Sequence, residues 1–426
     1  MNSFDKVIGY ENIKEELLQI CDMIRNRKHY EALGAKLPQG VLLYGEPGLG
    51  KTLMANCFIE ECGLESYTIR RNKGKDSFIE EITNTFRWAK ANAPAIVFLD
   101  DLDKFANEDN YRRDAEEYIA VQAGIDEVKG YSVFVLATAN DIDKLPTSLK
   151  RSGRFDRRTE VCAPSRKEAT EIIRYYLKDK KVAEDICVED ISMMIQYSSC
   201  AELETILNEA AIRAAYERKS SIDMKDLVRA VLAVEYEAPE DYSRVPEAKK
   251  RRVAVHEAGH MVISEVLCPG SVGMVSLRAQ GSESIGGFTR RCTEMEDISH
   301  YVLVFLGGKA ASELHYADGA ADGCYADLEE AAEEIRRDVS YGAKYGLSLL
   351  NMKNRFSSEI SDELNAKTEA VVHAELERLF YQARSILLKN WNFLQKTVDA
   401  LMEKETLLYS DIRALREASV LQKDVT

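Results

Sequence analysis

The sequence lacks the features that mark membrane, secreted and nucleic-acid-binding proteins. In 426 residues there is no run of about 18 apolar residues, the length that a membrane-spanning helix requires. The opening MNSFDKVIG has no basic-then-apolar leader pattern. Acidic residues outnumber basic ones by 72 to 57, so no net positive charge is available to hold a phosphate backbone. We therefore expect a cytoplasmic protein without a membrane segment in this chain and without a nucleic-acid partner.

The cysteines also lack a pattern. The chain has 9 cysteines, and no two of them form a C-x-x-C pair. An odd number of scattered cysteines is typical of a reducing compartment, where most thiols are buried and unpaired. The spacing argues against a cysteine-ligated metal site.

Helical and strand-like stretches alternate over the first part of the chain. Short apolar runs such as GVLLYG, AIVFLDD and VFVLATAN end in polar residues, and amphipathic stretches separate them. This rhythm predicts an α/β domain over residues 1–163 with a mostly parallel sheet, whose strand ends form the ligand-binding edge. Residues 164–236 are expected to be helical, 237–248 to be a linker rich in charge and proline, and 249–426 to be a mainly helical domain.

The stretch GEPGLGKT, Gly45 to Thr52, fits the phosphate-binding pattern G-x-x-x-x-G-K-[ST]. Its glycines let backbone N–H groups curl around an anion, and the following helix presents its positive end. Lys51 is expected to reach the β- and γ-phosphates, and the Thr52 hydroxyl to face Mg²⁺. The residues expected to bind the nucleotide are Glu46, Pro47, Gly48, Leu49, Gly50, Lys51, Thr52 and Leu53.

Two aspartates follow the apolar run AIVFL. Asp100 is expected to hold the Mg²⁺ shell, and Asp101 to orient or polarise the attacking water. A pair of aspartates at a strand end is commonly a solvated turn, but its place in the same sheet as the phosphate loop favours a catalytic pair.

The stretch AVHEAGHMV contains the pattern H-E-x-x-H. Positions i and i+4 of a helix share one face, so His256 and His260 can hold one metal ion with Glu257 beside it. A zinc ion there would lower the pKa of a bound water, and Glu257 could accept the proton as that water attacks a peptide carbonyl. A third ligand is required, and two acids compete for this role: Glu313 and Asp327.

Three stretches, GEPGLGKT, IVFLDDLDKF and ATANDIDKLPTSLKRSGRFDRR, resemble those of AAA+ ATPases. From Phe4 to about Leu415, the chain resembles the FtsH-type ATP-dependent zinc metalloproteases. This resemblance implies an AAA+ P-loop ATPase domain with a helical lid, followed by a mainly α-helical zinc metallopeptidase domain. It further implies the cofactors Zn²⁺, ATP and Mg²⁺, protein substrates and a homohexameric ring.

The resemblance also carries individual roles. Ile8 and Gly9 match positions beside the adenine, and Asn140 matches the sensor that places the water. Arg151 and Arg154 match the arginine fingers that act on a neighbouring subunit's γ-phosphate. Asp327, in GCYADLEEA, matches the aspartate ligand of zinc, which leaves Glu313 as an orienting or surface residue.

The chain departs from the family's pattern in three places. The stretch IRRNKGKDSFIEEI is shorter and more basic than the aromatic pore loop that grips substrate. Its Arg70, Arg71, Lys73 and Lys75 could grip acidic or disordered substrates, or pulling could be weak. Asp101 stands where the family has glutamate, and the inter-subunit motif reads Asp126 to Val128.

The leading hypothesis is an ATP-dependent zinc endopeptidase that unfolds and degrades proteins. One alternative is a zinc peptidase whose ATPase half serves assembly or switching, with weak or no translocation. Another is a non-proteolytic AAA+ remodeller, which the His256, Glu257, His260 and Asp327 set argues against.

Overall fold

A computed structural model describes residues 3–71, 75–107, 115–196, 198–238, 245–279, 286–293, 295, 297–316, 323–341 and 362–422. The chain forms two compact units. The first comprises Met1–Asp179 and Tyr197–Leu207, and the second comprises Lys180–Gln196 and Asn208–Thr426.

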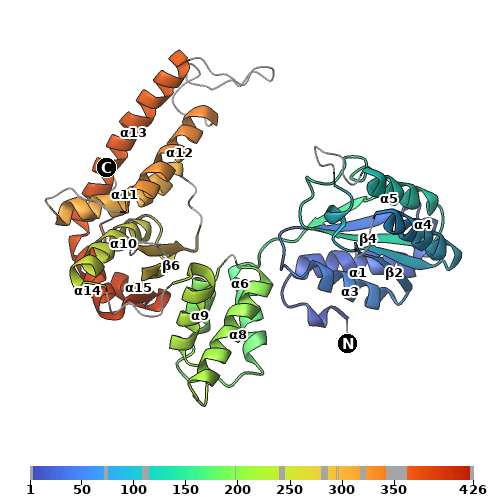
Figure 1. Cartoon of the computed structure of the whole chain (residues 1–426), viewed down its shortest axis with the longest axis horizontal. Helices are drawn as coiled ribbons and strands as arrows, with labels where there is room; N and C mark the ends of the chain where they lie inside the picture. The colour runs from blue at the N-terminus through green and yellow to red at the C-terminus, as the bar shows by residue number, and fades with distance from the viewer. Residues whose placement is uncertain are drawn as a thin grey trace. The chain divides into compact units, whose positions relative to one another are not determined.

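A five-stranded parallel sheet forms the centre of the first unit (Figure 1). Its strands follow the order β2-β3-β4-β1-β5. They span β1 Gly40–Tyr44, β2 Glu65–Ile69, β3 Ala95–Leu99, β4 Val133–Ala139 and β5 Arg157–Glu160. The expected parallel α/β sheet is therefore confirmed. Because all strands run in one direction, the residues that follow β1, β3 and β4 meet at one edge.

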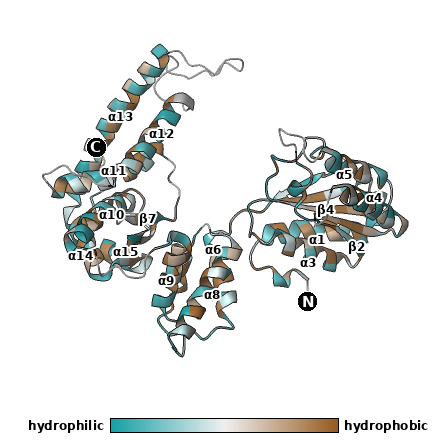
Figure 2. Ribbon diagram, in the orientation of Figure 1, coloured by the Kyte–Doolittle hydropathy of each residue, from teal (hydrophilic) through white to brown (hydrophobic). Residues whose placement is uncertain are grey.

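Helices cover both faces of this sheet because successive strand residues point to opposite sides. Leu42 packs with α4 Lys75–Ala91 and α5 Ala115–Glu127. Val41 and Leu43 pack with α1 Glu11–Arg25 and α3 Lys51–Cys62. The three central strands, β1, β3 and β4, are buried on both sides and almost uniformly apolar, and Figure 2 shows hydrophobic colouring in β4. Short helices η1 Ser3–Lys6, α2 Arg27–Ala32 and η2 Leu102–Lys104 complete this region.

Four helices follow Pro164, in the stretch expected to be helical. They are α6 Arg166–Leu177, α7 Val188–Met194, α8 Cys200–Tyr216 and α9 Met224–Tyr236. A capping box fixes the start of α6: the Ser165 hydroxyl accepts from the Glu168 N–H, and the Glu168 carboxylate accepts from the Ser165 N–H. This arrangement satisfies N–H groups that have no partner within the helix.

Beyond α9, the second unit is mainly helical, as expected. Its helices are α10 Glu247–Leu267, α11 Ile298–His315, α12 Tyr325–Tyr341, α13 Asp362–Lys389, α14 Trp391–Lys404 and α15 Tyr409–Glu417. Three antiparallel strands, β6 Val272–Ala279, β7 Gly286–Arg291 and β8 Thr406–Leu408, form a small sheet in the order β7-β6-β8. Helix α10 begins at Glu247, with Pro246 at its N-cap. This start lies inside the stretch expected to be a linker, because the first turns of the helix are polar.

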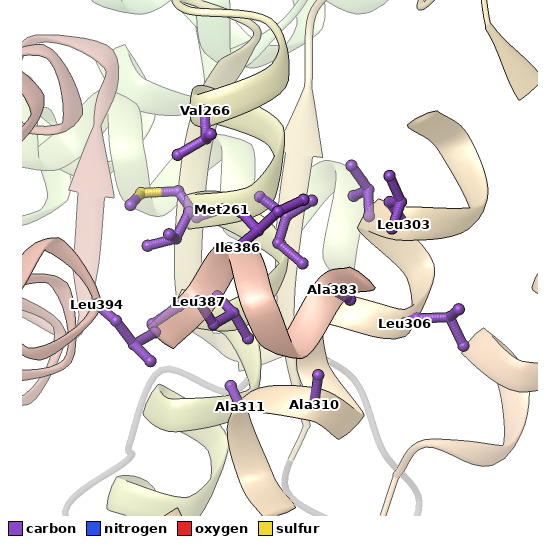
Figure 3. Packing of buried hydrophobic residues seen from close by; sticks show 14 of the residues in the cluster. Met261, Val266, Leu303, Leu306, Ala310, Ala311, Ala383, Ile386, Leu387 and Leu394 are labelled. Atoms are coloured by element: carbon purple, nitrogen blue, oxygen red, sulfur yellow. The ribbon is translucent and has the colours of Figure 1, made fainter. Parts of the chain in front are cut away.

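One apolar core joins α10, α11, α13 and α14. Figure 3 shows Met261 of α10, Leu303 and Leu306 of α11, and Ile386 and Leu387 of α13 within this core. All five side chains are 3% exposed or less. Burying a side chain of this size stabilises the fold by about 1.5–3 kcal/mol, so the core holds α10 rigidly in place.

Within the part of the chain that the structure describes, no helix has both the length and the apolarity to cross a bilayer.

Candidate functional site

The phosphate-binding loop connects β1 to α3. Gly48 and Gly50 adopt φ values of 80° and 85°, which L side chains rarely tolerate. A Cβ atom on Gly45 would lie 2.1 Å from the Val161 carbonyl oxygen. The sequence therefore uses glycine where the loop needs either a left-handed backbone or a close approach, and α3 begins directly after it at Lys51.

The Lys51 ammonium lies within this loop. Its Nζ donates to the carbonyl oxygens of Gly45, at 2.6 Å, and Glu46, at 2.7 Å. Burial lowers the pKa of Lys51, and the carboxylates of Asp101 and Asp103 oppose that effect. The cation is thus held in the concave side of the loop, where phosphate oxygens would lie.

Asp100 meets Thr52 at the edge of the sheet. Its Oδ1 accepts from the hydroxyls of Thr52, at 3.0 Å, and Thr138, at 2.8 Å. Its Oδ2 lies 3.1 Å from the Arg70 guanidinium. Asp100 is 3% exposed, so these contacts fix its carboxylate beside the threonine hydroxyl that the phosphate-binding pattern assigns to Mg²⁺.

Asp101 and Asn140 lie at neighbouring strand ends. Asp101 has a φ of 56°, and its Oδ2 lies 2.6 Å from the Lys104 ammonium. Its N–H donates to the Thr138 hydroxyl at 2.9 Å. The Asn140 N–H donates to Asp103 Oδ1 at 3.0 Å. The structure thus brings the expected catalytic aspartate and sensor to the edge of the sheet that holds Asp100.

The segment containing Ile8 and Gly9 approaches the phosphate loop through the first two residues of α8, Cys200 and Ala201. The Tyr10 hydroxyl lies 3.6 Å from the Cys200 thiol, and the neighbouring Ala201 N–H donates to the Gly48 carbonyl at 3.1 Å. The start of α8 therefore lies between the expected adenine-side segment and the loop.

The two expected arginine fingers have different environments. Arg154 forms an ion pair with Asp126 at 2.8 Å and donates to the Ser148 carbonyl at 2.6 Å. The hydrogen bond that Arg154 donates to Asp126 lowers the pKa of that carboxyl group. Arg151 is exposed, and no partner for its side chain is found among the described residues.

Two of the basic residues considered for substrate gripping are engaged in ion pairs. Arg70 contacts Asp100, as described above, and Arg71 lies 3.4 Å from the buried Glu117 carboxylate. Lys73 falls outside the described residues, as does the side chain of Lys75.

The peptidase half brings His256, His260 and Asp327 together. The Asp327 Oδ2 lies 3.1 Å from His256 Nε2 and 3.4 Å from His260 Nε2. One ligand atom from each residue lies within 4.8 Å of the others. Two imidazole nitrogens and one carboxylate oxygen around a common point form a donor set that suits zinc and leaves a fourth position open. Glu313 is engaged elsewhere, at 2.7 Å from Lys309 and 3.1 Å from Arg384.

Glycines let α11 approach the histidines closely. A Cβ atom on Gly308 would lie 2.4 Å from His256 Cε1 and 2.5 Å from His260 Nε2. One turn of α10 away, a Cβ atom on Gly259 would lie 2.3 Å from the Gly307 carbonyl oxygen. The two helices can cross at this distance only because both sides lack a Cβ atom.

The outer ring nitrogens of the two histidines have unequal partners. His260 Nδ1 lies 2.6 Å from the Val304 carbonyl oxygen, whereas His256 Nδ1 lies 3.6 Å from the Cys324 thiol. Both contacts direct the Nε2 atom toward Asp327. Burial by itself lowers the pKa of His260, but Asp327 outweighs this effect and raises it to about 9. Burial would raise the pKa of Asp327, yet its histidine hydrogen bonds lower that pKa well below its usual value.

Glu257 is buried beside this group. Its side chain is 5% exposed, and its Oε2 accepts from the Thr289 hydroxyl at 2.9 Å. Burial raises the pKa of Glu257, which makes it a stronger base. A Cβ atom on Gly287 would lie 2.6 Å from Glu257 Cγ, so strand β7 passes directly over the glutamate.

The other face of β7 is anchored to the end of α9. The Phe288 and Tyr236 rings stack at 3.6 Å with an interplanar angle of 7°. Arg290 forms an ion pair with Glu235 and donates to the Tyr236 hydroxyl at 3.0 Å. In the described sheet, β7 is the edge strand beside Glu257, and these contacts hold it there.

A cleft of about 820 Å³ opens onto the metal-binding group. Its lining includes Phe305 and Val253 as apolar surfaces and the N-terminal part of α10 as a polar one. A cleft of this size accommodates several residues of an extended peptide.

Sequence reasoning missed four residues of these sites. Thr138, Thr289, Gly308 and Cys324 lie far along the chain from the motifs that they support. Thr138 stands two residues before Asn140 in an otherwise apolar strand. A polar residue near the carboxyl end of such a strand could have indicated a contact with the nucleotide site. The other three have no local pattern that marks them.

Two family models match the chain. The model described as "ATPase family associated with various cellular activities (AAA)" matches residues 41–163, and "Peptidase family M41" matches residues 243–415. The first covers the phosphate loop and the aspartates, and the second covers the histidines, Glu257 and Asp327.

Curated relatives match nearly the whole chain. The ATP-dependent zinc metalloprotease FtsH 2 of Symbiobacterium thermophilum is 31% identical over 445 residues, which cover 98% of this chain and 75% of the relative. The ATP-dependent zinc metalloprotease FtsH of Caldicellulosiruptor bescii is 30% identical over 97% of this chain and 72% of the relative. The ATP-dependent zinc metalloprotease FtsH of Leptotrichia buccalis is 31% identical over 97% of this chain. This chain spans 56% of the length of that relative.

Proposed function

The chain belongs to the FtsH family of ATP-dependent zinc metalloproteases, and we propose that it is an ATP-driven zinc endopeptidase that unfolds and degrades proteins. The observation that carries this proposal is the presence of two groups of converging side chains in one chain, one suited to ATP and one suited to zinc. Lys51, Thr52 and Asp100 converge at one sheet edge, and His256, His260 and Asp327 converge beside Glu257.

On the peptidase side, His256, His260 and Asp327 would hold the zinc ion, whose Lewis acidity activates water and polarises the scissile carbonyl. Glu257 would accept the proton of the attacking water, and its raised pKa suits a general base working near neutral pH. Thr289 keeps one carboxylate oxygen of Glu257 in place. Strand β7 offers an unpaired edge, among the described strands, to which an extended substrate could add by backbone pairing.

On the ATPase side, the loop from Glu46 to Leu53 would cradle the phosphates, and Thr52 and Asp100 would hold Mg²⁺. Asp101 and Asn140 would orient the attacking water, and Ile8 and Gly9 would flank the adenine. Asp101 must part from Lys104 to do so, since that ammonium lies 2.6 Å from its carboxylate.

The assembly and location of the protein are part of the same proposal. A homohexameric ring would allow Arg151 and Arg154 to reach a neighbour's γ-phosphate. A cytoplasmic location is supported by nine cysteines that are all free thiols, as a reducing compartment keeps them.

The test compares a folded, tagged protein with a permanently unfolded one, each with ATP, without ATP and with a zinc chelator. Degradation of the folded substrate that requires both ATP and zinc is the expected result. In the same assay, Glu257→Gln should abolish cleavage by removing the base while ATP hydrolysis continues. Cleavage of the unfolded substrate alone, with no effect of ATP, would instead support a peptidase whose ATPase half serves assembly or switching.

A further inference from the structure

Arg70 is the first residue after β2 and belongs to the basic stretch considered for substrate gripping. Strands β2 and β3 are paired in parallel, with Ile69 opposite Leu99, and the Asp100 N–H donates to the Ile69 carbonyl oxygen at 3.0 Å. Because the next residues along two paired strands lie side by side, this register brings Arg70 next to Asp100. Its cation therefore lies at the nucleotide site, where the roles proposed above do not require it.

The two carboxylate oxygens of Asp100 have partners of different kinds. Its Oδ1 accepts from the hydroxyls of Thr52, at 3.0 Å, and Thr138, at 2.8 Å. These two donors use the lone pairs that one carboxylate oxygen offers. Its Oδ2 lies 3.1 Å from the Arg70 guanidinium. The oxygen that is left for the Mg²⁺ shell is therefore the one that Arg70 holds.

This ion pair joins an exposed cation to a buried anion. The Arg70 side chain is 62% exposed, whereas that of Asp100 is 4% exposed. The same guanidinium nitrogen lies 3.9 Å from Asp101 Oδ2, a longer contact, so Asp100 is its main partner. A carboxylate at this depth is costly without a compensating charge. Arg70 thus stabilises Asp100 whenever no metal ion is bound, and its exposed side chain can turn into solvent without disturbing the sheet.

A divalent ion and the guanidinium compete for this carboxylate. Mg²⁺ is bound in proteins through carboxylate oxygens and substrate phosphates, and the Thr52 hydroxyl that the phosphate-binding pattern assigns to Mg²⁺ donates to Asp100. Two cations that share one carboxylate repel each other at the short distance between them. The Arg70 contact therefore weakens Mg²⁺ binding, and a bound Mg²⁺ weakens the Arg70 contact.

We propose that Arg70 is an internal counter-ion of Asp100 and sets the Mg²⁺ concentration at which the protein binds ATP. In the nucleotide-free protein, Arg70 holds Asp100 Oδ2, and it leaves this oxygen when Mg²⁺ and ATP bind together. The inference rests on the proposed ATPase function and adds a positioning residue to that site. It assigns Arg70 to the nucleotide site and not to the gripping of substrate.

The experiment uses the full chain and a fluorescent, non-hydrolysable ATP analogue, so that binding is measured without turnover. Titration with Mg²⁺ at a fixed analogue concentration gives the Mg²⁺ concentration for half-maximal binding, and EDTA gives the affinity without a metal ion. For Arg70→Met, we expect half-maximal binding at an Mg²⁺ concentration about tenfold lower, the scale of one hydrogen bond to a charged group. The affinity in EDTA should change by less than about twofold, as for the loss of one exposed charge.

Two further variants separate the contact with Asp100 from the general effect of charge. Lys104→Met is the matched control, because the Lys104 side chain is 59% exposed and pairs with Asp101. It should shift the Mg²⁺ requirement by less than about twofold. Arg70→Lys keeps the charge and should restore most of the original Mg²⁺ requirement. The melting temperature of Arg70→Met should be lower without nucleotide, and Mg²⁺ with the analogue should raise it more than in the unmodified protein.

An unchanged Mg²⁺ requirement in Arg70→Met would overturn the inference, as would an equal shift in Lys104→Met. A large loss of analogue affinity in EDTA would also overturn it, because Arg70 would then bind phosphate and not compete with the metal ion. Failure of the unmodified protein to bind the analogue at any Mg²⁺ concentration would overturn the proposed ATPase function itself. That outcome is distinct from binding whose Mg²⁺ requirement does not depend on Arg70.

Discussion

At the scale of single residues, the metal-binding group depends on an absent side chain as much as on its ligands. Gly308 leaves the space in which both imidazoles lie. Gly308→Ala would place a methyl group about 2.5 Å from two ring atoms, so the rings or α11 must move. We expect zinc affinity to fall by about tenfold or more, as for other groups that orient metal ligands. Competition with a chromogenic chelator measures this.

Gly286→Ala is the matched control for that substitution. Gly286 lies in the same cleft, but among the described residues a Cβ atom there would meet no other atom within 4 Å. Its zinc affinity should equal that of the unmodified protein. Equal zinc affinities of the two variants would mean that α11 shifts without a loss of stability and that its close packing does not position His256 and His260.

The sequence predicted those members of the candidate metal site that lie close together along the chain. His256, Glu257 and His260 are recognisable because a helix brings i and i+4 to one face. Asp327 was found only by resemblance, since reasoning from the residues left Glu313 as a competitor. Thr289, Gly308 and Cys324 could not be predicted, because their roles arise only when β7, α11 and α12 fold against α10.

At the scale of secondary-structure elements, strand β7 connects the end of α9 with Glu257, the proposed catalytic base. Its residues alternate between Thr289, which contacts Glu257, and Arg290, which contacts Glu235 and Tyr236. Arg290→Ala leaves the Glu235 carboxylate half-buried without this partner and loosens the strand. We expect kcat for a short peptide to fall by about tenfold, since misplaced catalytic groups lose about this factor or more.

ATP hydrolysis, measured on the same protein, should be unchanged by Arg290→Ala. Arg337→Ala, which removes an exposed i,i+3 pair with Glu334 on α12, is the control and should leave peptide cleavage intact. A loss confined to KM would show instead that Arg290 acts on substrate binding and not on the placement of Glu257.

Elements were predictable where the pattern was periodic. The apolar runs form strands, because a strand buried on both faces is apolar at successive positions. The amphipathic stretches form helices, because a helix buried on one face is apolar at every third or fourth position. The start of α10 was less visible. Glu247 and Ala248 were expected to belong to the charged linker, yet they begin the helix that carries His256 and His260.

At the scale of the whole molecule, the two expected arginine fingers should behave differently when replaced. Arg151 is exposed, whereas Arg154 is held by Asp126 and the Ser148 carbonyl. We expect Arg151→Ala to slow ATP turnover by about 10³-fold, the scale of an arginine supplied by a neighbour. ATP affinity and the melting temperature should remain unchanged. Arg154→Ala should lower the melting temperature as well.

Turnover measured across protein concentrations, together with sedimentation velocity, tests this. If a neighbour supplies the arginine, turnover per subunit rises with assembly, and mixing Arg151→Ala with an Asp101→Asn variant restores part of the activity. Turnover that is independent of concentration would argue for a complete site within one subunit. A single chain cannot reveal this, because a residue that acts on a neighbour has no partner in its own fold.

The unequal support of the two metal-binding histidines has a kinetic consequence. A metal ion leaves such a site one bond at a time, and the first bond to open is the one whose ring turns most easily. The Val304 carbonyl that holds His260 belongs to a helix backbone and is present whatever residue occupies that position. The thiol that holds His256 belongs to a side chain that a single codon change or one oxidation event can alter. If His256 and His260 hold a metal ion, we therefore expect its release to begin at His256, the ring with the longer contact.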